Sequence, residues 1–151
     1  MKIILLLFIF WLYHLCFCEF CKSQVFVEQD FLLRSKDFRT GIYFKHQLKD
    51  NLNMTIGYER MKFDENINTS LFFSFTNYSL YLLYEKRSMG FAIDKRIGNH
   101  LLYLELNNLK EKELNFYYYY DINGNFSFKF GLEKLNKGKI DPMVGFFILL
   151  D

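Results

Sequence analysis

The chain has 151 residues, of which 51% are hydrophobic and 21% aromatic, and its 19 Lys and Arg against 17 Asp and Glu give a formal net charge of +2. This length accommodates one domain. The basic residues form no block along the sequence, which argues against a nucleic-acid partner.

The N-terminal segment predicts a cleaved secretory signal peptide, residues 1–18. Met1-Lys2 is a charged start, residues 3–15 form an apolar core, and Cys16-Phe17-Cys18 offers small residues before a cut. Residues 19–151 would then form a single β-barrel domain whose only cysteine is Cys21, which excludes an intramolecular disulfide and a Cys-rich metal site. A retained anchor is the alternative, but the apolar run is shorter than the ~20 residues a span needs.

The rest of the chain alternates apolar and polar residues, which is the pattern of β-strands. Clusters of Asn, Asp, Gly, Ser and Lys separate the alternating segments, and no helical period competes with them. We predict ten strands at residues 25–33, 38–48, 52–60, 70–76, 78–85, 89–94, 102–107, 114–120, 126–132 and 142–150.

Connections are expected where turn-forming residues interrupt the alternation. Asn123-Gly124 supplies the positive-φ turn of a hairpin, the clearest in the chain. Residues 64–66 and 95–99 are also expected in connections. Strands of about this length separated by short turns are typical of a membrane-spanning β-barrel.

The two faces of the predicted strands differ in composition. From residue 38 to residue 150 one parity is almost free of charge, whereas the other carries small and tyrosyl side chains among scattered charges. A soluble sandwich would turn its second face to water and favour Lys, Glu, Thr and Gln. Small groups beside large ones instead suit a narrow, filled lumen. The small residues are Gly41, Gly57, Ser70, Ser74, Ser79, Gly90, Ala92, Ser127, Gly131 and Gly145, and the tyrosines are Tyr43, Tyr81, Tyr103, Tyr117 and Tyr119.

These features predict an all-β fold, an antiparallel up-and-down β-barrel of about 8 to 10 strands and of the membrane type. The chain resembles the small bacterial outer-membrane β-barrel proteins over essentially its whole mature length, in architecture rather than in a family-specific motif. The resemblance implies the cell outer membrane as location, and membrane lipid and the barrel-insertion machinery as partners. Such barrels commonly end in Phe or Trp, whereas this chain ends Ile148-Leu149-Leu150-Asp151.

Eight charged residues fall on the parity expected to face the lumen. They are Arg39, Lys45, Glu59, Glu85, Asp94, Glu105, Lys129 and Glu133. A buried charge needs a partner whether or not it has a function. We therefore interpret these residues as internal pairs that neutralise a polar lumen, rather than as a proton-transfer or ion-selective site. Tyr and Phe on the same parity would occlude a small barrel, which argues against a pore.

No pattern predicts a catalytic residue, a cofactor or a metal. His46 and His100 have no Cys, His or carboxylate at metal-ligand spacing, and no Gly-rich phosphate loop is present. Four Asn-x-Ser/Thr motifs, at Asn53, Asn68, Asn77 and Asn125, match the pattern of N-glycosylation sites. The same pattern arises without any glycan where an Asn in a turn is followed by a Ser or Thr in a strand.

The sequence favours a non-enzymatic outer-membrane protein with a structural or interaction role. The alternative is a secreted or periplasmic soluble β-barrel or sandwich that binds a lipid or another apolar ligand. A third interpretation is an enzyme that modifies membrane lipid.

Overall fold

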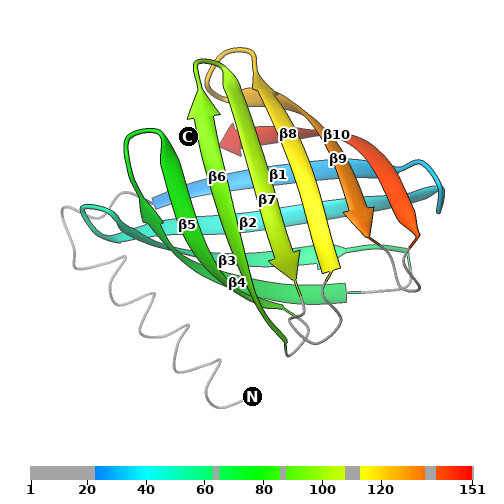
Figure 1. Cartoon of the computed structure of the whole chain (residues 1–151), viewed down its shortest axis with the longest axis horizontal. Helices are drawn as coiled ribbons and strands as arrows, with labels where there is room; N and C mark the ends of the chain where they lie inside the picture. The colour runs from blue at the N-terminus through cyan, green and yellow to red at the C-terminus, as the bar shows by residue number, and fades with distance from the viewer. Residues whose placement is uncertain (1–22, 63–64, 86–87, 108–112, 135–138, 151) are drawn as a thin grey trace.

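The computed structural model describes residues 23–62, 65–85, 88–107, 113–134 and 139–150. Within them, ten antiparallel strands form a closed barrel: each strand pairs with its neighbour in sequence, and β1 pairs with β10 (Figure 1). The strands are β1 Ser23–Leu32, β2 Asp37–Lys49, β3 Leu52–Arg60, β4 Glu65–Ser74, β5 Tyr78–Glu85, β6 Ser88–Ile97, β7 His100–Asn107, β8 Glu113–Asp121, β9 Phe126–Lys134 and β10 Ile140–Leu150. The predicted all-β up-and-down barrel is confirmed, at the upper end of the predicted strand number. The predicted signal peptide and Cys21 lie outside the described residues.

Two strands continue through residues expected in connections. β4 begins at Glu65, which pairs with Arg60 of β3, and β6 continues to Ile97, which pairs with His100 of β7. Phe75, by contrast, was expected in a strand but lies in the β4–β5 turn. Its N–H donates a hydrogen bond to the Tyr78 carbonyl there, at 2.8 Å. Backbone pairing between neighbours in a closed sheet satisfies donors and acceptors whatever the side chain, so it overrides local turn preference.

The connection from β8 to β9 is wider than the predicted two-residue turn, because the Ile122 N–H bonds to the Phe126 carbonyl at 2.9 Å. Gly124 has a φ of +82°, but Asn123 has no positive φ. Instead, Asn123 Oδ1 accepts hydrogen bonds from the backbone N–H groups of Asn125 (3.2 Å) and Phe126 (2.9 Å). The left-handed turn is therefore confirmed for Gly124 and wrong for Asn123, whose side chain closes the wider loop by hydrogen bonding.

The outward face of the barrel is apolar and exposed. Phe91 of β6 is 52% exposed, Phe128 of β9 is 46% exposed, and the outward parity of the other strands is similar. The set also includes Ile42, Phe44, Phe73, Leu80, Leu82, Ile93, Leu104, Phe116, Phe130 and Val144. A continuous apolar surface of this kind is suited to lipid rather than to water. In the described ranges, no helix is long and apolar enough to span a membrane.

The two edges of the barrel differ in their connections. At one edge, which we call the terminal end, β1 begins and β10 ends, with Val25 paired to Leu150. The connections there are residues 50–51, 75–77, 98–99 and 122–125. At the opposite edge, the loop end, they are residues 33–36, 61–64, 86–87, 108–112 and 135–139.

Candidate functional site

The inward face encloses a cavity of about 790 Å³. All eight charged residues predicted to face the lumen line this one cavity: Arg39 and Lys45 of β2, Glu59 of β3, Glu85 of β5, Asp94 of β6, Glu105 of β7, and Lys129 and Glu133 of β9. They divide between two parts of the wall, which Tyr43 joins by hydrogen bonds to Glu28 and Glu59.

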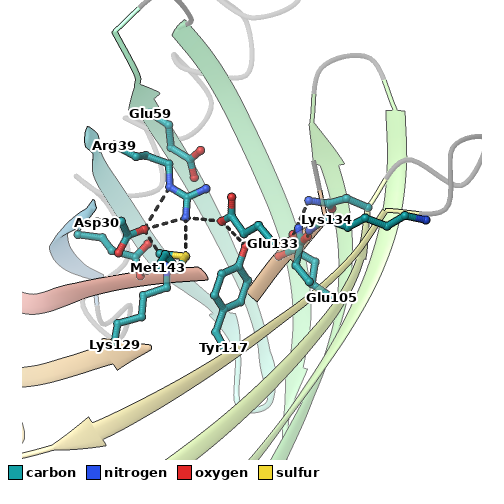
Figure 2. A network of polar contacts seen from close by, with 12 residues as sticks. Asp30, Arg39, Glu59, Glu105, Tyr117, Lys129, Glu133, Lys134 and Met143 are labelled. Atoms are coloured by element: carbon teal, nitrogen blue, oxygen red, sulfur yellow. Dashed lines mark hydrogen bonds and ion pairs between the residues drawn. The ribbon is translucent and has the colours of Figure 1, made fainter. Parts of the chain in front are cut away.

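The first part is an ion-pair cluster formed by β1, β2 and β9. Arg39 Nη2 lies 2.7 Å from Asp30 Oδ2 and 2.6 Å from Glu133 Oε1, so the guanidinium bridges two carboxylates. Figure 2 shows Arg39 between them, above the Met143 sulfur. Tyr117 donates its hydroxyl to Glu133 at 2.7 Å, which holds that carboxylate toward Arg39.

Lys129 completes the ion-pair cluster from the other side. Its Nζ lies 2.8 Å from Glu28 Oε1 and 3.0 Å from Asp30 Oδ2, and 4.3 Å from the centre of the Tyr117 ring. The cluster therefore contains two cations and three carboxylates. Glu28 also accepts a hydrogen bond from Tyr119 at 3.1 Å. Because the side chains of Lys129 and Asp30 are only 3% and 1% exposed, each depends on the other for charge compensation.

Sequence reasoning missed Glu28 and Asp30. Both lie on the inward parity of β1, whereas the apolar residues Val27 and Phe31 lie on the outward parity. This difference between the two parities was the signal that could have identified them. It also missed Asp141, a fully buried residue of β10. Its carboxylate accepts hydrogen bonds from the backbone N–H groups of Arg34 (2.7 Å) and Ser35 (3.0 Å), and so fastens the β1–β2 turn.

The second part of the wall carries carboxylates with neutral partners. Glu59 accepts hydrogen bonds from the Tyr43 hydroxyl and from Asn68 Nδ2, the latter at 2.8 Å. Glu105 accepts from Asn107 and from Asn115, the latter at 3.2 Å. Asp94 accepts from the Tyr81 hydroxyl, and Glu85 accepts from Asn66 at 2.7 Å and Asn107 at 3.2 Å. Among the described residues, no Lys or Arg forms an ion pair with Glu59, Asp94 or Glu105.

Aromatic side chains cover the wall between these groups. Phe26 stacks on Tyr43 with ring centroids 4.9 Å apart, and Phe72 stacks on Tyr81 at 4.7 Å. Both pairs are direct cross-strand neighbours. The rings therefore lie against each other along the wall.

The lumen is filled in one sector only. Leu32, Tyr117 and Met143 form a buried cluster beside the ion pairs. Sequence analysis predicts a filled lumen throughout, whereas the remainder of the interior is the cavity described above.

The histidines lie apart from the charged groups of the lumen. His46 Nδ1 is 2.9 Å from the Ser23 hydroxyl, and His100 Nδ1 is 2.7 Å from the Tyr118 hydroxyl. Within the part of the chain that the structure describes, no group of three or more His, Cys, Asp or Glu is placed to hold a metal ion.

A closed antiparallel barrel with an apolar exterior and a charged, hydrogen-bonded interior is a membrane β-barrel.

No protein-family model matches the sequence, and no curated protein matches it significantly. The solved structures that are similar to it include the following two. One, described as "De novo design of transmembrane beta-barrels", has 11% sequence identity and a TM-score of 0.43, and the alignment covers 85% of this chain and 94% of that one. The other, described as "KdgM porin in complex with disordered oligogalacturonate", has 11% identity and a TM-score of 0.48, covering 84% of this chain and 98% of that one.

Proposed function

We propose that this protein is a small β-barrel of the cell outer membrane with a structural or interaction role and no chemistry of its own. The observation that carries the proposal is the apolar outward face, which alternates with a polar and charged inward face along the strands. Burying a charge in lipid is costly, so a membrane barrel directs its charges to the lumen. The ion-pair cluster follows this rule.

The connections support an orientation in that membrane. Periplasmic turns of outer-membrane barrels are short, and the extracellular loops are longer. The turns at the terminal end include two of two residues, 50–51 and 98–99, whereas the loop end includes two of five, 108–112 and 135–139. We therefore place the terminal end in the periplasm and the loop end outside, where the loops are available to other proteins.

Export through a cleaved signal peptide, residues 1–18, and folding by the barrel-insertion machinery are parts of the same proposal. A soluble lipid-binding barrel, the alternative, would need to shield the outward face from water. Phe91, Phe128 and their neighbours on that face are instead open to the surroundings.

Two measurements on cell membranes test the proposal. A membrane-spanning barrel stays in the pellet after washing with alkaline carbonate, and it migrates differently on gels before and after boiling because its paired backbone resists detergent at room temperature. Release into the wash, together with identical migration of boiled and unboiled samples, would favour the soluble alternative.

A further inference from the structure

We propose that the lumen passes small monovalent cations in preference to anions. This inference rests on the proposed function, because it requires the barrel to cross a membrane. It adds an activity that the sequence patterns argue against, and it stands on the extent of the cavity and on the charge of its lining.

The cavity extends between the two ends of the barrel. Its lining includes Asn77, Asn99 and Gly124 from turns at the terminal end, and Met61, Glu113 and Lys134 from the loop end. One cavity of about 790 Å³ therefore contacts both edges and has room for water along the wall. The stacked pairs Phe26–Tyr43 and Phe72–Tyr81 line this cavity, which continues past them to both edges.

The lining is acidic although the chain as a whole has a formal charge of +2. Among the described residues, nine carboxylates and five cationic side chains line the cavity, a formal excess of four negative charges. The acids are Glu28, Asp37, Glu59, Glu85, Asp94, Glu105, Glu113, Asp121 and Glu133, and the cations are Arg39, Lys45, Arg96, Lys129 and Lys134. A confined space lined by one sign of charge, with low-dielectric walls, concentrates counter-ions.

The most buried cations of the lining are already engaged. Arg39 and Lys129 are held by the three carboxylates of the ion-pair cluster, so neither is available to an incoming anion. The Lys45 ammonium lies over the Phe72 ring, 5.5 Å from its centre.

Three carboxylates on the other part of the wall, Glu59, Asp94 and Glu105, form no ion pair with a Lys or Arg among the described residues. They accept hydrogen bonds only from hydroxyl and amide donors among those residues. Such donors stabilise a carboxylate without neutralising it. Carboxylates along a water-filled path are the arrangement by which cation channels select their ions. A permeating cation would compensate these groups, and an anion would be repelled.

Reversal potentials test the inference directly. The full-length protein is inserted into planar lipid bilayers with a KCl gradient across the membrane, and the potential of zero current is measured. We expect a reversal potential whose sign is that of K⁺ flux down its gradient rather than that of Cl⁻ flux. The double variant Glu59→Gln with Glu105→Gln should shift the reversal potential toward zero, because glutamine keeps an acceptor oxygen and replaces two lumen carboxylates by neutral amides.

The matched control is Glu65→Gln. Glu65 lies at the same end of the barrel, but it is outside the cavity lining, and its side chain is 61% exposed beside Arg60. This variant should leave the reversal potential unchanged. If the double variant does not fold, Asp94→Asn removes a lumen charge from another strand and should give a smaller shift in the same direction.

Gel mobility of the same preparations separates the two proposals. A protein that is heat-modifiable and resists carbonate, but conducts nothing, overturns the cation path and leaves the membrane barrel standing. A reversal potential near zero or of the sign of Cl⁻ flux, or one that the lumen variants do not move, also overturns the cation path. A protein that never inserts overturns both.

Discussion

Lys129 of β9 and Asp30 of β1 form an ion pair at 3.0 Å although another strand, β10, lies between theirs. In the sheet register Asp30 stands opposite Gly145, and Gly145 stands opposite Lys129. The two side chains therefore meet across a position that has no side chain. A Cβ at Gly145 would collide with the Asp30 carboxylate and with the backbone carbonyl of Gln29.

This relationship predicts that Gly145→Ala is destabilising. The added methyl group must displace backbone as well as a side chain, and overpacking of this kind costs about 1–3 kcal/mol. Urea unfolding of the detergent-folded protein, followed by gel mobility, measures the free energy of unfolding. Val144→Ala is the control, because Val144 is next in sequence but lies on the outward face. A Gly145→Ala variant as stable as the wild type would contradict the packing described here.

Removing the charge of Lys129 should lower the free energy of unfolding more than Gly145→Ala does. Lys129→Met leaves Glu28 and Asp30 buried with one partner fewer, and breaking a buried pair costs about 3–5 kcal/mol. The exposed pair Arg60–Glu65, with its nitrogen and oxygen 3.8 Å apart, provides the comparison, because Arg60→Met should cost about 0–1 kcal/mol. Equal losses in the two variants would show that the ion-pair cluster does not stabilise the barrel.

The β8–β9 turn gives a local prediction. Gly124 has a φ of +82°, a region that costs an L-residue about 1–2 kcal/mol. Gly124→Ala should therefore lower the free energy of unfolding by about that amount. Asn123→Ala, which removes the side-chain acceptor of two backbone N–H groups, should also destabilise the loop. If Gly124→Ala is neutral, the turn does not have this conformation.

Side-chain parity is a local property, and it was enough to predict the strands and the inward position of residues such as Tyr43 and Glu105. Partnerships across the lumen are not local. The ion pair between Lys129 and Asp30 joins residues 99 apart in the chain, and it exists only because β1 pairs with β10. The position of Glu28 and Asp30 on the parity opposite to Val27 and Phe31 was visible, but nothing in the sequence indicates that they would meet Lys129.

The open part of the lumen also could not be predicted from the sequence. The number of inward aromatic residues predicts occlusion, yet how much of the lumen the rings fill depends on how each packs against its neighbour in the adjacent strand. Phe72 and Tyr81 are opposite each other in the register and stack with their ring planes 23° apart. The volume that they leave free is a consequence of pairing, not of composition.

Fluorescence quenching by lipids with brominated acyl chains tests most directly whether the outward face meets the membrane. A Trp11→Phe background removes the only tryptophan of the chain. Phe128→Trp then places an indole on the outward face of β9, and Tyr119→Trp places one in the lumen on β8. We expect strong quenching of the first and little of the second, because quenching requires near contact and the barrel wall separates the two positions. Equal quenching of both indoles, or none of either, would contradict a barrel that spans the membrane.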